Sequence, residues 1–239
     1  MSVKDLIKER SEKRKLLSEI KLIILKDPQK KLKDFKKMNV KTIDDILGLF
    51  INIGNMAYFS GDNDTFEFFM DSLFDVIHMN LELDREKMIK CIYNYGLLSA
   101  HNHDIIPYSI ILNNFRKTIF ELTETITINN YLRILKDLAL NSEINNYELG
   151  VMDVLNVFKD LYDHFLDKNM HVNRLYLQNI VISLISSSES NHHERLKNTT
   201  LIEAKKVLEF EPIKARLEAS EVGSIQSVGE SEAPNPKVL

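Results

Sequence analysis

The chain has 239 residues, of which 44% are hydrophobic and 28% are charged, and this balance excludes a wholly disordered protein and a membrane bundle. Only 7 Gly and 5 Pro occur, so glycine-rich loops that cradle phosphate are not expected. The formal net charge is -4, yet residues 1–41 hold 14 Lys or Arg against 6 Asp or Glu, so a basic N-terminal segment precedes an acidic remainder.

The first predicted helix begins after Ser2 and runs for about 24 residues, until Asp27-Pro28 stops it. A second start signal at Thr42 and Asp45 opens a helix that Gly61 ends. Apolar residues at helical spacing then continue along the chain, with Asp104, Ser142, Asn146 and Thr200 as candidate helix caps. The later helices are expected at about 66–77, 88–98, 105–122, 128–140, 147–165, 172–185 and 201–217.

No segment alternates apolar and polar residues in the manner of a strand, so the predicted fold class is all-α, with antiparallel helical hairpins stacked as in an α-solenoid. The sequence divides into a basic helical arm (1–41), a helical-repeat domain (42–219) and a Ser-, Gly- and Pro-containing tail (220–239), which is expected to be disordered.

The single cysteine, Cys91, has no partner for an internal disulfide, which favours a reducing, cytoplasmic setting. No stretch approaches 18 uninterrupted apolar residues, so no membrane span is expected.

An internal repeat is the most informative feature of the sequence. Residues 53–62 are echoed 42 residues later by residues 95–104. Where two helices cross, a small residue lets their backbones approach, and a polar residue in the turn caps the following helix. The paired positions are Gly54 with Gly96 and Asp62 with Asp104.

The first copy resembles a tetratricopeptide repeat. Ile53-Gly54-Asn55 matches the Leu-Gly-Asn of the first helix, Tyr58 matches its aromatic residue, and Gly61-Asp62 matches the turn before the second helix. Phe66 and Leu73 stand where that family has small residues. The resemblance implies a stack of helical hairpins with a concave surface that binds a protein or peptide.

We therefore expect a non-enzymatic interaction module or scaffold with a protein or peptide partner and no cofactor. Paired asparagines at 113–114, 129–130 and 145–146 are expected to cap or end helices, and the alternative is an exposed Asn ladder that grips a peptide backbone.

One alternative is a metal-dependent phosphohydrolase that resembles the all-α HD family. His78, the pair His103-Asp104 and a later acid occur in the order which that family uses to hold metal ions that activate water. The candidates for the later acid are Asp137, Asp160 and Asp163.

A second alternative is a nucleic-acid adaptor that uses the basic arm. Lys30, Lys33 and Lys37 are the candidate contacts to a polyanion, and Leu32 with Phe35 would anchor their helix. The acidic remainder of the same chain competes for these lysines, so docking of the arm on the body, with weak binding to nucleic acid, is the expectation.

Overall fold

The computed structural model describes residues 3–26, 43–79, 85–191 and 193–207. Within these residues all regular structure is α-helical, which confirms the predicted fold class. The helices are α1 (Val3–Lys26), α3 (Ile43–Phe59), α4 (Asn63–Met79), α5 (Arg85–Asn102), α6 (Ile105–Glu121), α7 (Thr125–Ile144), α8 (Glu148–Asp167), α9 (His171–Ser190) and α10 (Glu194–Val207).

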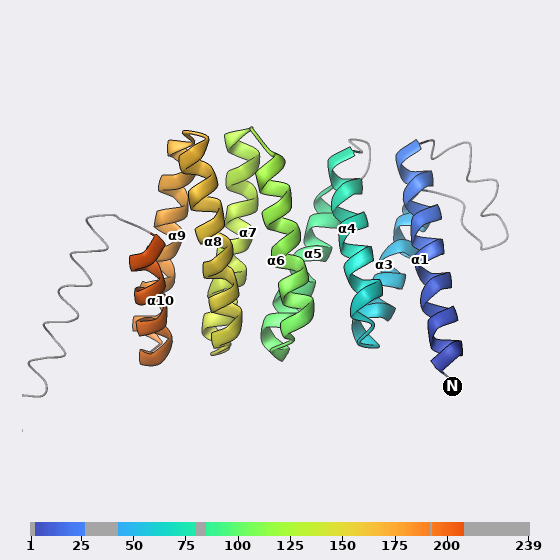
Figure 1. Ribbon diagram of the computed structural model, residues 1–239, viewed down its shortest axis with the longest axis horizontal. Helices are drawn as coiled ribbons and strands as arrows, with labels where there is room; N and C mark the ends of the chain where they lie inside the picture. Colours follow the sequence, from blue (N-terminus) through green and yellow to red (C-terminus); the bar gives the residue numbers. More distant parts are fainter. Residues whose placement is uncertain (1–2, 27–42, 80–84, 192, 208–239) are drawn as a thin grey trace, which may run out of the picture.

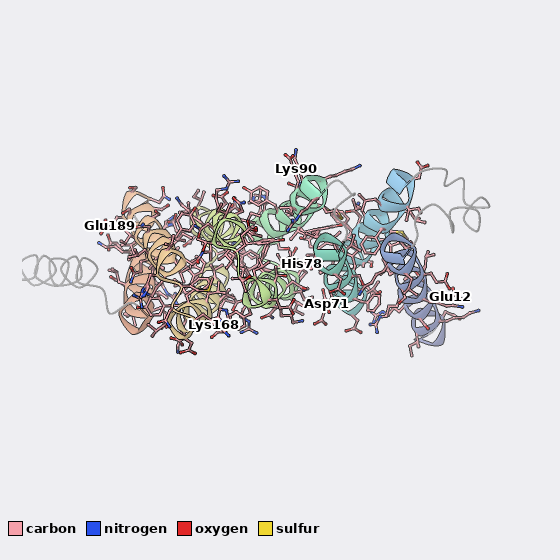
Figure 2. All side chains as sticks on the ribbon, turned by 90° about the horizontal axis from the view of Figure 1, so that it is seen from above. Glu12, Asp71, His78, Lys90, Lys168 and Glu189 are labelled. Atoms are coloured by element: carbon pink, nitrogen blue, oxygen red, sulfur yellow. The ribbon has the colours of Figure 1, made fainter. Side chains whose placement is uncertain are left out.

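The helices stand side by side in chain order, from α1 at one end of the molecule to α10 at the other (Figure 1). Seen from above, they form two layers (Figure 2). One layer contains α3, α5, α7 and α9, and the other contains α1, α4, α6, α8 and α10. From α3 onward, neighbours in each layer are two helices apart in the chain. This is the antiparallel stacking of hairpins that defines an α-solenoid.

The core runs between the two layers along the whole stack. Its first section is aromatic: the Phe69 ring lies 5.0 Å from that of Phe50, and the Tyr95 ring lies 5.2 Å from that of Phe66, measured between centroids. Leu17 and Ile20 of α1 are fully buried in the same cluster. The basic N-terminal helix therefore covers the end of the described stack as part of its core, because its apolar stripe packs against α3 and α4.

Three hairpins, α3–α4, α5–α6 and α7–α8, turn in the same way. Backbone N–H groups of Asp62, Asp104 and Tyr147 donate to carbonyls five residues earlier, at 2.9, 2.8 and 2.8 Å. The residue before each of them has a positive φ: Gly61 (67°), His103 (59°) and Asn146 (53°). This Schellman turn satisfies the last carbonyls of the first helix and reverses the chain.

Several boundaries differ from those predicted. α10 begins at Glu194 rather than near Thr200, because Leu196 is the only apolar residue in its first turn and the periodicity is weak there. Thr200 and Ser142 do not cap helices as predicted, since both lie inside helices and are fully buried. Asn113, Asn114, Asn129 and Asn130 also lie inside helices, so the prediction that they cap or end them is wrong; Asn145 and Asn146 do end α7.

Candidate functional site

The two glycines paired by the repeat allow close approaches, but to different partners. A Cβ on Gly54 would lie 2.4 Å from the Phe69 ring of the same hairpin. A Cβ on Gly96 would lie 2.6 Å from Leu138 of α7, in the next hairpin. The same sequence signal therefore serves packing within one hairpin and packing between two.

The paired aspartates also differ. Asp62 Oδ1 accepts a hydrogen bond from the Thr65 backbone N–H at 3.3 Å, as an N-cap does. Asp104 occupies the N-cap position of α6, but its side chain makes no cap bond, so the predicted cap is wrong at this position. Its carboxylate instead accepts a hydrogen bond from the Tyr58 hydroxyl at 2.8 Å, since that buried hydroxyl in the preceding hairpin needs an acceptor.

Tyr58 therefore links the first two hairpins. Its hydroxyl also accepts a hydrogen bond from Ser99 at 3.3 Å. Burial raises the pKa of Tyr58, and the nearby Asp104 carboxylate adds to the rise. The phenol stays neutral and acts as a donor, which fits a structural tie between hairpins and not a proton-transfer group.

The residues proposed as metal ligands do not converge. His78 lies near the end of α4, beside Arg85 at the start of α5, and burial followed by the Arg85 charge lowers its pKa. His103 and Asp104 follow the opposite end of α5, an 18-residue helix, and a helix of that length spans about 27 Å. His103 stacks on Tyr147 with ring centroids 4.8 Å apart.

Of the candidate later acids, Asp160 has another partner, and so does Asp153, an acid of α8 that is not among those candidates. Asp160 pairs with Arg116, and Asp153 accepts a hydrogen bond from Ser109 at 2.6 Å. These bonds join α6 to α8 in the second layer. In the described part of the chain, no group of three or more His, Cys, Asp or Glu side chains is arranged to hold a metal ion.

The described part of the basic arm is docked on the body. Arg10 lies 3.3 Å from Asp62, Arg14 lies 3.4 Å from Asp64, and Lys21 pairs with Asp75. All of these carboxylates belong to α4 or to the turn that precedes it. The other candidate contacts, Lys30, Lys33 and Lys37, lie outside the described residues, as do Leu32, Phe35 and the predicted tail.

A groove separates α3 from α5 in the first layer. α5 packs closely on α7, because Gly96 admits Leu138, whereas α3 stands farther from α5. The space between them is about 360 Å³, and Ile51 and Phe59 of α3 form one wall. Cys91 and Leu98 of α5 form the other wall.

This groove continues over α5 to a shallower depression. The depression lies between the C-terminal halves of α5 and α7, with Leu97 and Ile144 on its two sides. Asn94 and Leu98 line both hollows, so the two hollows are adjacent on the two sides of α5. We call the surface that contains both hollows the α3–α5–α7 face. Its solvent-facing apolar residues include Phe59 (73% exposed) and Ile144 (62% exposed).

Amide side chains line the α3–α5–α7 face at intervals. Asn55, Asn94, Asn141 and Asn145 belong to three successive helices of one layer or to the turn that follows them. An amide offers both a donor and an acceptor, which matches the hydrogen-bonding groups of a peptide backbone. Two of the four are partly engaged within the chain, because Asn55 Oδ1 accepts a hydrogen bond from the Tyr95 hydroxyl and the Asn145 amide bonds to Asn141 and His101. Of these four, only Asn145 belongs to an asparagine pair that stands out in the sequence. The other three stand singly, and only the stacking of the helices aligns them.

No described helix combines the length and the apolar content needed to cross a lipid bilayer. No protein-family model, no curated protein and no solved structure matches this chain.

Proposed function

We propose that the protein is a non-enzymatic interaction module, or scaffold, that binds a peptide segment of a partner protein on the α3–α5–α7 face. The observation that carries the proposal is the adjacent pair of hollows on the two sides of Asn94 and Leu98, with apolar walls and amides among the lining residues. The cytoplasmic setting and the tetratricopeptide-like mode of binding, both expected from the sequence, belong to this proposal.

The exposed apolar residues support it. Phe59, which lines the groove, is 73% exposed, and Met56, one turn earlier in α3, is 57% exposed. A large aromatic side chain next to a hollow gains contact area when a ligand covers it, and clustered exposed apolar residues mark interaction sites. A bound peptide would place side chains against these walls and its backbone against the amides.

The charges near the groove indicate which peptides would bind. Lys90 lines the α3–α5 groove and projects into solvent from α5 (Figure 2). It makes no ion pair with any described residue. A peptide with an acidic residue beside its apolar anchor would gain electrostatic attraction there, whereas a basic peptide would be repelled.

Random-peptide phage display against the full chain tests the proposal. We expect enriched peptides that combine aromatic or aliphatic residues with an acidic residue, and that do not bind a Leu98→Arg variant. Leu98 is half-buried and lines both hollows, so an arginine there places a charged side chain against the apolar walls of both.

A matched control is Leu166→Arg. Leu166 is 49% exposed at the end of α8, in the other layer, and should accept the same substitution without effect on the selected peptides. A selection that yields no enriched peptide, or peptides that bind both variants alike, contradicts the proposal.

A further inference from the structure

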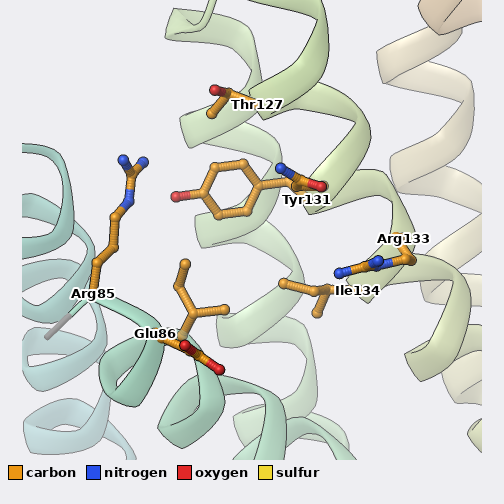
Figure 3. Close-up of a pocket in the computed structure, with 8 residues that line it drawn as sticks. Arg85, Glu86, Thr127, Tyr131, Arg133 and Ile134 are labelled. Atoms are coloured by element: carbon orange, nitrogen blue, oxygen red, sulfur yellow. The ribbon is translucent and has the colours of Figure 1, made fainter.

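A second pocket lies between α5 and α7 at the opposite end from the shallow depression (Figure 3). Its volume is about 500 Å³. The two helices touch at Gly96 and Leu138 and separate toward their N-terminal ends, where the first turns of α5 and α7 enclose the space. Among the described residues, none lines both this pocket and the α3–α5–α7 face.

Tyr131 carries the argument. The side chain is almost fully buried, since only 3% of the residue is exposed, and its hydroxyl has no hydrogen-bond partner among the described residues. Figure 3 shows this hydroxyl projecting from α7 toward the α5 side of the pocket, where Arg85 stands. Buried hydroxyls are normally paired, so an unpaired one directed into a cavity points to a group that the pocket is built to receive.

Two guanidinium groups line the pocket: Arg85 stands on the side of that hydroxyl, and Arg133 lies on the other side of the Tyr131 ring, beside Ile134 (Figure 3). Arg85 lies on the α5 side of the pocket and Arg133 on the α7 side (Figure 3). Neither forms an ion pair with a described residue. Glu86 is the only carboxylate among the described lining residues, so their formal charge is +1, and this carboxylate lies away from the Tyr131 hydroxyl. Guanidinium groups that hold no carboxylate are suited to bind an oxyanion in two-point fashion.

The lining also has an apolar part. Ile89 of α5 and Ile134 of α7 contribute it, and Figure 3 shows Ile134 extending into the space between the two helices. A bare inorganic ion would leave these surfaces uncovered, whereas a molecule with a hydrocarbon or aromatic body would bury them.

We propose that this pocket binds a small organic anion, a molecule with an apolar body and one terminal carboxylate or phosphate group. The oxyanion accepts hydrogen bonds from Arg85 and the Tyr131 hydroxyl, the apolar body lies against Ile89 and Ile134, and the Arg133 charge adds electrostatic attraction from beside Ile134 (Figure 3). The inference does not depend on the proposed partner-binding face.

Calorimetric titration of the full chain tests this site, with phenyl phosphate, benzoate and inorganic phosphate as probes. Either aromatic anion should bind about 10-fold more tightly than inorganic phosphate, because only they cover the two isoleucines. Whichever of phenyl phosphate and benzoate binds more tightly shows whether the pocket prefers a phosphate or a carboxylate head group. Arg85→Gln should weaken binding by about 10-fold, Arg133→Gln should weaken it less, and Glu86→Gln should strengthen it.

Tyr131→Phe separates a binding role from a structural one. It removes only the unpaired hydroxyl, so thermal stability should be unchanged or higher while binding weakens by about 5-fold. Lys90→Gln, which removes a solvent-exposed cation outside the pocket, is the control and should leave binding unchanged. The proposal is overturned if no aromatic anion binds, if Lys90→Gln weakens binding as much as Arg85→Gln does, or if Tyr131→Phe binds as the unaltered chain does.

Discussion

Glu143, the penultimate residue of α7, accepts a hydrogen bond through Oε1 from Nδ1 of His193, at 2.9 Å, in the turn before α10. Glu143 and Tyr58 occupy equivalent positions in their turns, because each lies one residue after a carbonyl that closes the turn. The Tyr58 hydroxyl donates to Asp104, which lies in the turn of the following hairpin, as His193 lies in the turn of the hairpin that follows Glu143. Turn-to-turn bonds between successive hairpins thus recur with different chemistry, and they fix the stagger of the stack.

The Glu143 carboxylate is fully buried and has three donors. Besides His193, it accepts hydrogen bonds from Ser187 Oγ at 2.5 Å and Asn191 Nδ2 at 2.9 Å. Glu143→Ala leaves these donors without their acceptor and should lower the free energy of unfolding by about 3 kcal/mol, measured by urea denaturation. Glu148→Ala breaks the exposed pair with Arg195 and should cost less than about 1 kcal/mol. Equal losses in both variants would show that the buried carboxylate does not anchor the turn.

Alanine substitutions at three glycines distinguish the effect of steric crowding on stability from the effect of helix propensity. Gly54→Ala places a Cβ 2.4 Å from the Phe69 ring and should destabilise the protein by about 1–3 kcal/mol. Gly96→Ala should do the same through Leu138, at 2.6 Å. Gly48, within α3, has open space where a Cβ would lie, with no described atom within 4 Å, so Gly48→Ala should stabilise by about 0.5–1 kcal/mol. Thermal denaturation gives all three values, and a neutral Gly54→Ala would contradict the close approach of α3 and α4.

The stability of the protein should fall as the solution becomes mildly acidic. Burial, and then the charge of Arg85, lowers the pKa of His78 below its ordinary value of 6.5. At a pH between the lowered pKa of folded His78 and 6.5, the unfolded chain binds a proton that the folded chain does not. The stability that neutral His78 contributes to the folded protein is therefore complete above pH 6.5 and is lost as the pH falls through the folded pKa. In urea denaturation at several pH values, His78→Gln should reduce the fall below pH 6.5, whereas His171→Gln, at an exposed residue, should not. An unchanged pH profile in His78→Gln would contradict the assignment.

The thiol of Cys91 should react slowly. Burial raises the pKa of Cys91 from 9.0 to about 11, and only the thiolate is nucleophilic. Alkylation by iodoacetamide at mildly alkaline pH should therefore be roughly 100-fold slower than for the same chain unfolded in urea. Mass spectrometry of timed samples measures both rates. Similar rates would mean that the wall of the α3–α5 groove is open at Cys91.

The helices could be predicted from the sequence because apolar spacing is a local property, as the match at α1 and α6 shows. The interactions between hairpins could not be predicted from the sequence. In the sequence Asp104 resembles Asp62, which caps a helix. In the structure the Asp104 carboxylate makes no cap bond and accepts a hydrogen bond from Tyr58, 46 residues earlier. Glu143 looks like an ordinary surface acid, and only the stacking of α9 on α7 buries it.

The candidate site was the least predictable part. The groove exists because α3 and α5 diverge, and that divergence depends on packing between layers rather than on any motif. The resemblance to a repeat family predicted a partner-binding surface, but nothing in the local sequence indicates that Asn94 and Leu98 lie at the centre of the candidate face.

The most direct measurement of the central claim is the affinity of one display-selected peptide for three chains: the unaltered protein, Leu98→Arg and Leu166→Arg. Isothermal titration should show binding to the unaltered protein and to Leu166→Arg with equal dissociation constants, and binding at least ~10-fold weaker to Leu98→Arg. Circular dichroism should show the same helix content in all three chains. Equal affinities for Leu98→Arg and the unaltered protein would contradict a binding site on the α3–α5–α7 face.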